Sequence, residues 1–257
     1  MKNYLSVTCL VIVSVLTTLV LLTPLHRATG DDLEWRRAAA HAKANSPVLV
    51  FVTLKEDGSI SRESAYCGAS TIANDRVLTA AHCVDNEARV ESTWVYFQDG
   101  RKFKVKSMAS FNIGLDLAVL NVPGVLPVGT VVISDDIATG DEIMGTGAPG
   151  GEMFKASWGR IDRIYTGQHD VCDGIRRPVP IGHKPHQVVE TDRVSFFGYS
   201  GGGIWNGAGR LVGVHVRGSY WEPYPGYSCS ESYRGEYLVF GAAVGGKTVI
   251  EFLNSKP

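Results

Sequence analysis

The chain has 257 residues, and its 25 lysine and arginine residues nearly balance 26 aspartate and glutamate residues, which leaves a formal net charge of −1. Nucleic-acid-binding proteins normally carry a basic excess, so the charge argues against that class. With 44% hydrophobic and 20% charged residues, the chain has enough apolar material for a packed core, which excludes intrinsic disorder. Its 29 glycines separate short runs of β-branched and aromatic residues, a pattern typical of an all-β protein with many turns.

An uncharged, mostly apolar run occupies residues 5–25. As a helix, its 21 residues would be about 31 Å long, which matches the ~30 Å hydrocarbon core of a bilayer. We interpret the run either as a signal anchor that tethers the protein to a membrane through residues 5–25, or as a signal peptide within residues 1–30. In the second case, the small residues 28–30 allow cleavage before Asp31. Both interpretations place the rest of the chain outside the cytoplasm, either tethered or as a secreted or periplasmic protein.

Residues 31–46 contain two acids followed by alanine, arginine and lysine, and this composition predicts a short helix or linker. From residue 47 the pattern changes to short β-type runs separated by glycine, aspartate, asparagine or serine. The first set comprises residues 47–53, 70–73, 76–80, 90–97, 102–109 and 117–122; the second comprises 142–147, 156–165, 186–191, 202–205, 211–216 and 236–240. Two sets of six predict an all-β domain over residues 47–257 with two six-stranded antiparallel barrels, followed by a short helix at 247–253.

Four cysteines follow the apolar run, and an even number in an exported protein predicts two disulfides. They are Cys67, Cys83, Cys172 and Cys229. The count alone leaves their pairing open.

Residues with catalytic chemistry are concentrated in three short motifs. They are Thr-Ala-Ala-His-Cys at 79–83, Asp-Leu-Ala-Val-Leu at 116–120 and Gly-Tyr-Ser-Gly-Gly-Gly at 198–203. Together they resemble the trypsin/chymotrypsin-fold serine peptidases, and the resemblance covers roughly residues 48–252. It implies two six-stranded Greek-key barrels with the active site between them.

The resemblance also implies roles for the motif residues. Serine is a poor nucleophile at neutral pH, so His82 would accept the proton of Ser200, and Asp116 would orient the imidazole. The backbone N–H groups of Gly198 and Ser200 would form the oxyanion hole. The order histidine, aspartate, serine is the chymotrypsin-type order.

In this family the two cysteines around the histidine motif form a disulfide, which implies a Cys67–Cys83 bond. Cys172 and Cys229 then pair by elimination. Four residues between 169 and 186, namely His169, Cys172, His183 and His186, also suggest a zinc site. Pro185 separates the last two histidines, and Cys172 already has a disulfide role, so we favour a solvated loop and expect neither a metal nor another cofactor.

Gly-x-Ser-x-Gly also occurs at the nucleophile of α/β-hydrolases, which makes an esterase an alternative. That fold requires a helix directly after the serine and the order serine, acid, histidine. Glycines 201–203 are a poor helix start, and the order here is reversed. The sequence therefore favours the peptidase.

The chain departs from trypsin around the serine. In trypsin the preceding residue is an aspartate that pairs with a newly freed N-terminal amine, whereas this chain has Tyr199 and lacks the Ile-Val-Gly-Gly start before residues 48–51. We therefore expect a fold that is competent without zymogen cleavage. Gly203 replaces the usual proline. The pattern is closer to glutamyl endopeptidases, viral chymotrypsin-like proteases and the protease domain of high-temperature-requirement proteases, without the PDZ module of the last group.

Substrate preference is expected to depend on residues that the resemblance places around the specificity pocket. These residues are Val194 at its base, then Ser195, His215, Val216, Arg217 and Gly218. The Ser195 hydroxyl and a His215 N–H, or a protonated imidazole, would bind a carboxylate or amide oxygen. Cleavage after Glu, or after Gln, is the resulting hypothesis; the alternative is that His215 is an ordinary strand residue bonded to neighbouring backbone.

These observations predict an exported serine endopeptidase that acts on proteins or peptides through an acyl-enzyme. The alternative is a protease-fold binding protein without turnover, because Tyr199, Gly203, Val216 and Arg217 are unusual around such a site. No nucleic-acid partner is expected, and the sequence leaves the oligomeric state open.

Overall fold

The structure, a computed structural model, describes residues 30–54, 57, 59–85, 92–167, 186–192, 198–219 and 240–255. The chain divides into two units, Met1–Glu34 and Trp35–Pro257. The helix that we expect over residues 5–25 lies outside the described residues. Within the described part of the chain, no helix is both long and apolar enough to cross a membrane.

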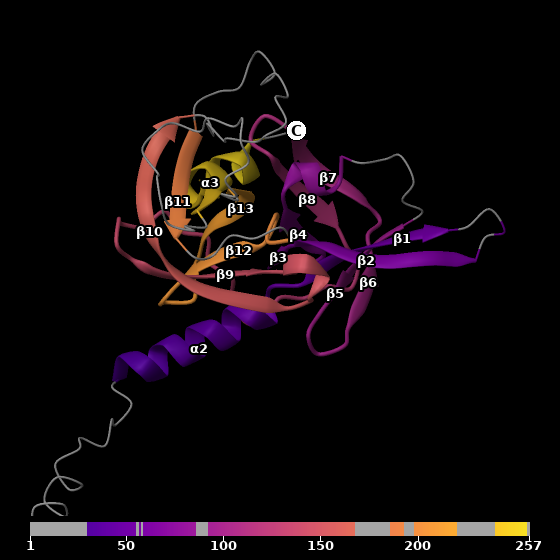
Figure 1. The fold of residues 1–257 in the computed structure, drawn as a ribbon, viewed down its shortest axis with the longest axis horizontal. Helices are drawn as coiled ribbons and strands as arrows, with labels where there is room; N and C mark the ends of the chain where they lie inside the picture. Colours follow the sequence, from indigo (N-terminus) through magenta and orange to yellow (C-terminus); the bar gives the residue numbers. More distant parts are fainter. Residues whose placement is uncertain are drawn as a thin grey trace, which may run out of the picture. The chain divides into compact units, whose positions relative to one another are not determined.

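The C-terminal half contains a closed antiparallel barrel of six strands, as the sequence predicts (Figure 1). The strands are β9 (Glu142–Gly147), β10 (Lys155–Gly167), β11 (His186–Asp192), β12 (Gly203–Asn206), β13 (Leu211–Ser219) and β14 (Phe240–Gly245). They close in the order β10-β11-β14-β13-β12-β9. Each strand contributes one buried apolar side chain to a common cluster, because alternate residues of a strand face the barrel interior. The cluster is Ile143, Ile161, Val189, Ile204, Val212 and Ala243.

The N-terminal half consists of two four-stranded antiparallel sheets, which corrects the expectation of a second closed barrel. One sheet has the order β2-β1-β5-β6, and the other has the order β3-β4-β8-β7. Their strands are β1 (Val48–Leu54), β2 (Ile60–Gly68), β3 (Ser70–Ala73), β4 (Arg76–Thr79), β5 (Ser92–Tyr96), β6 (Lys102–Lys104), β7 (Ser107–Asn112) and β8 (Leu117–Asn121).

The chain passes directly from one sheet to the other at two short bends. Ala69 alone separates β2 from β3, and only Val105 and Lys106 separate β6 from β7. At Ala69 the backbone N–H donates to the carbonyl of Pro47, and the Lys106 N–H donates to the carbonyl of Asn121. Strand pairing changes partner at these bends, so the ladder is divided into two sheets instead of one closed barrel.

The two halves are in contact through backbone as well as side chains. A Cβ on Gly68, at the end of β2, would lie 2.7 Å from the Cα of Gly202, so this approach requires glycine. A shared apolar cluster includes Leu78 and Leu120 from the N-terminal half and Trp205 and Leu211 from the barrel. The halves are therefore packed together around the segment that leads into β12.

A short helix follows the barrel, as the sequence predicts: α3 (Gly246–Asn254) lies against β13 and buries Val249 and Phe252 (Figure 1). The segment 31–46 contains α2 (Gly30–Ala44). From Trp35 onward this helix packs on the barrel: Trp35 meets Trp158 edge to face with ring centroids 5.1 Å apart.

Candidate active site

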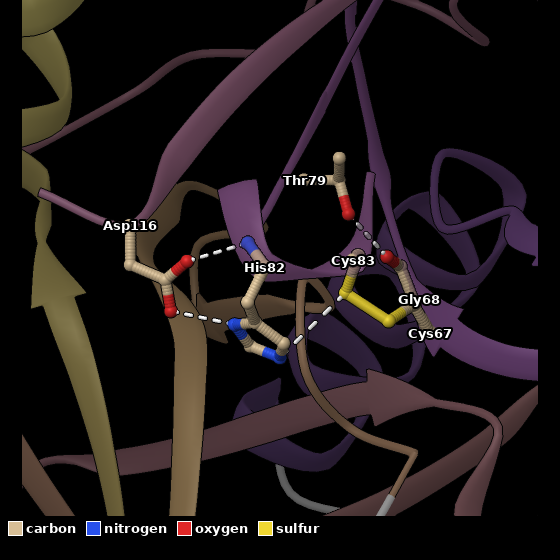
Figure 2. The surroundings of a disulfide bond; sticks show 6 residues. All are labelled: Cys67, Gly68, Thr79, His82, Cys83 and Asp116. Carbon is tan, nitrogen blue, oxygen red and sulfur yellow. Dashed lines mark hydrogen bonds and ion pairs between the residues drawn. A yellow bond between two sulfur atoms is a disulfide. The ribbon is translucent and has the colours of Figure 1, made fainter. Parts of the chain in front are cut away.

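His82 and Asp116 are brought together by two neighbouring segments of the N-terminal half. His82 lies in η1 (Ala81–Cys83), which begins two residues after β4, and Asp116 directly precedes β8, the partner of β4. Asp116 Oδ2 lies 2.6 Å from His82 Nδ1, and Oδ1 accepts a hydrogen bond of 2.8 Å from the His82 backbone N–H (Figure 2). The Ala81 N–H also donates to the Asp116 carbonyl. One aspartate therefore orients both the imidazole ring and the backbone that carries it.

The backbone of Asp116 has the left-handed conformation, with φ of 55°. Aspartate tolerates this region better than most residues. The turn before it is closed by two hydrogen bonds, from the Asp116 N–H to the Ile113 carbonyl and from the Leu115 N–H to Asn112 Oδ1. The Asp116 side chain is 13% exposed and that of His82 is 43% exposed, so the carboxylate is shielded while the imidazole remains open to solvent.

The Cys67–Cys83 disulfide is present and lies beside His82 (Figure 2). Cys83 Sγ lies 3.8 Å from His82 Nε2. The sulfur atoms are bonded to each other, so they are not the thiolates that a metal ion would require, although they lie close to the imidazole nitrogens. Cys172 and Cys229 lie outside the described residues, as do His169 and His183.

The turn that carries Ser200 is fixed by backbone hydrogen bonds to three other segments. The Gly198 carbonyl accepts from the Ala148 N–H, the Ser200 carbonyl accepts from the Gly68 N–H at 2.8 Å, and the Gly201 N–H donates to the His215 carbonyl. Because Gly68 is bonded directly to Cys67, this contact places Ser200 beside the disulfide that flanks His82. The three segments together hold the serine turn at the junction of the two halves.

Position 201, at the same junction, can accept only a glycine. Its φ is 78°, and a Cβ here would overlap the Thr79 hydroxyl and the Gly68 carbonyl. Thr79 is fully buried and donates to the Gly68 carbonyl at 2.9 Å (Figure 2). Thr79 is a site residue that our sequence reasoning missed, although it opens the histidine motif.

His215 lies in β13, only 2% exposed, and its backbone N–H donates to the Gly202 carbonyl. Burial, together with repulsion from nearby His82, lowers the pKa of the imidazole to about 3. The ring is therefore uncharged at neutral pH. The sequence allows either a neutral N–H or a protonated imidazole at His215. The lowered pKa excludes the protonated ring at neutral pH, so recognition of a substrate carboxylate by His215 would need the neutral N–H as donor.

The other expected pocket residues are only partly described. Val216 is buried and lies at an irregularity in the pairing of β13 with β14, between His215, which pairs with Ala243, and Arg217, which pairs with Ala242. Gly218 continues this strand. Val194 and Ser195 lie outside the described residues. The described residues thus bring together His82, Asp116 and the Ser200 turn, with His215 in the adjoining strand.

Comparisons with known proteins show the family of the chain and the fold that it shares. The model of the trypsin-like peptidase domain family matches residues 67–214. Among solved structures, the HtrA-type protease AlgW with a tripeptide has a TM-score of 0.61 at 21% identity, over 86% of this chain and 62% of that chain. The active form of the Rv3671c protease from M. tuberculosis has a TM-score of 0.60 at 22% identity, over 88% of each chain.

The inactive form of the Rv3671c protease is similar to this chain to the same degree, with a TM-score of 0.59. At these identities the similarity shows a shared fold. The chain spans about three fifths of the length of the AlgW chain. A comparison with curated protein sequences finds no match.

Proposed function

Because the chain belongs to the trypsin-like peptidase family, we propose that it is a serine endopeptidase with Ser200 as nucleophile, His82 as general base and Asp116 as the residue that orients His82. The observation that carries the proposal is the pair of hydrogen bonds from His82 to one carboxylate, beside the turn that holds Ser200. The similarity of the fold to two proteases adds support.

In the proposed reaction, His82 Nε2 accepts the proton of the Ser200 hydroxyl while Ser200 Oγ attacks the carbonyl carbon of the peptide bond. Asp116 Oδ2 accepts a hydrogen bond from Nδ1–H and stabilises the imidazolium that forms. The backbone N–H groups of Gly198 and Ser200 stabilise the oxyanion. His82 then donates the proton to the leaving amine, and a water molecule activated in the same way hydrolyses the acyl-enzyme.

The test is cleavage of a peptide library by the full chain and by Asp116→Asn. The amide keeps the size of the side chain but no longer favours the required imidazole tautomer, so we expect kcat to fall about 10⁴-fold. Asp136→Asn serves as the matched control and should retain full activity. The Asp136 side chain is 83% exposed and lies in the connection between the two halves, residues 122–141. Equal activity of Asp116→Asn and the full chain would contradict the assignment.

The same digest tests substrate preference. We propose cleavage after Glu, or after Gln, with Val194, Ser195, His215, Val216, Arg217 and Gly218 around the pocket. Because His215 is uncharged, it would act in this recognition as a hydrogen-bond donor, which serves a Gln amide as well as a Glu carboxylate. Cleavage mainly after aromatic or basic residues would refute this preference.

We also propose that the domain works outside the cytoplasm. Two features support this location, the apolar run at residues 5–25 and the Cys67–Cys83 disulfide, because disulfides persist mainly in oxidising compartments. Fractionation of the producing cells that recovered the protein in the cytoplasm would contradict it.

A further inference from the structure

The side chain of Tyr199, between Gly198 and Ser200, is buried within the protein and is only 1% exposed. Its phenol oxygen lies 2.5 Å from the hydroxyl oxygen of Ser157 on β10, so that one hydroxyl donates a hydrogen bond to the other. Ser157 pairs in turn with Gly145 of β9. The residue beside the nucleophile is thus bonded through its side chain to the β9–β10 hairpin.

Neighbouring residues confine the Tyr199 ring. A Cβ at Gly147 would lie 2.7 Å from the Tyr199 Cα and 3.0 Å from its Cδ1, so the ring occupies space that only a glycine leaves. On another side the ring meets His215 edge to face, with centroids 6.1 Å apart and an angle of 82° between the ring planes. Close packing limits the rotation of a ring held in this way.

The backbone of Tyr199 takes part in the hydrogen bonds of the serine turn. Its carbonyl accepts a hydrogen bond from the Gly202 N–H, and the preceding Gly198 carbonyl accepts one from Ala148, next to Gly147. The N–H groups assigned to the oxyanion hole belong to the residues on either side, Gly198 and Ser200. A change in the position of Tyr199 would therefore move both donors.

We propose that Tyr199 is a positioning residue that fixes the oxyanion-hole turn through its hydrogen bond with Ser157. The inference rests on the proposed peptidase function. In the trypsin pattern an aspartate at this position requires a freed N-terminal amine. A phenol–hydroxyl pair requires no amine, so the turn keeps its conformation without N-terminal processing.

The charge state of Tyr199 is consistent with this pair. Burial raises the pKa of the phenol, although the Ser157 hydrogen bond and nearby Lys155 partly oppose that effect. Lys155 itself is paired with Glu152 at 2.7 Å. The phenol therefore remains protonated at neutral pH and can act as a donor to Ser157 or as an acceptor from it.

A double-mutant cycle tests the proposal with Tyr199→Phe, Ser157→Ala and the combined variant. Loss of the hydrogen bond should lower kcat about tenfold in either single variant with little change in KM, and the combined variant should lose no more than either alone. Ser157→Thr keeps a hydroxyl at this position, so it should retain most of the kcat of the unaltered chain. Tyr165→Phe is the matched control, because Tyr165 donates to Glu190 from the same strand; it should leave kcat unchanged.

Hydrogen exchange separates this proposal from the peptidase assignment. Amides of residues 198–202 should exchange faster in Tyr199→Phe and in Ser157→Ala than in the unaltered chain, whether or not the protein cleaves peptides. If the unaltered chain cleaves nothing, the peptidase proposal fails and the exchange rates still decide the positioning role. Unchanged exchange at residues 198–202, or unchanged kcat in an active protein, would overturn the role of Tyr199.

Discussion

The buried imidazole of His215 makes the stability of this protein depend on pH. In the folded state its pKa is lowered from 6.5 to about 3, first by burial and then by the charge of His82. An unfolded chain exposes the ring and returns the pKa to its ordinary value. Between these two values the unfolded state binds a proton that the folded state does not, so stability falls as the pH falls through this range.

Replacement of His215 by glutamine should remove this contribution. The free energy of unfolding of the unaltered chain should decrease by about 2 kcal/mol more than that of His215→Gln when the pH is lowered from 7 to 5. Urea denaturation at pH 7, 6 and 5 measures the difference between the two slopes, which does not depend on how much the substitution itself destabilises the fold. Parallel pH profiles would show that His215 titrates alike in both states.

At the scale of elements, α2 is part of the packed body from Trp35 onward. Its buried residues Ala38, Ala39 and Ala42 form one face, and His41 lies edge to face with Trp205 of β12. The sequence predicts only a linker or short helix here, because alanines give little contrast between the two faces. Ala38, Ala39 and Ala42 lie three, four and seven residues after Trp35, and this helical spacing is the sequence pattern that indicates a buried face.

Asn45, directly after α2, is fully buried and holds the connection between the two halves. Its side-chain amide donates to the carbonyls of Val128 and His41, and its Oδ1 accepts from the Val128 N–H. Both hydrogen-bonding groups of the Val128 backbone therefore depend on one side chain. No local sequence pattern indicates a contact across 83 positions.

Asn45→Ala should lower the free energy of unfolding by about 2 kcal/mol, since it leaves partly buried backbone groups of Val128 without these partners. Lys43→Ala is the matched control, because Lys43 is exposed on α2 and should change stability by less than about 0.5 kcal/mol. Equal effects of the two substitutions in thermal or urea denaturation would contradict this account of Asn45.

For the whole molecule, the sequence predicts the C-terminal barrel, α3 and the Cys67–Cys83 bond correctly. The β-type runs and the family's histidine motif carry those predictions. It misses the division of the N-terminal half, because no strand is predicted over β2 and a run with a period of two residues at 102–109 does not reveal the bend at Val105. It also misses Ser157 as the partner of Tyr199: the two lie 42 positions apart and only the fold brings their hydroxyls together.

The central claim is that the junction between the two halves makes Ser200 nucleophilic. A fluorophosphonate probe reacts with a serine activated by a neighbouring base, and mass spectrometry of the labelled protein identifies the modified residue. We predict one adduct on Ser200 in the folded chain, and none in Ser200→Ala or in the unaltered chain unfolded by urea. A cooperatively folded chain that remained unlabelled, or an adduct on another residue, would contradict the account.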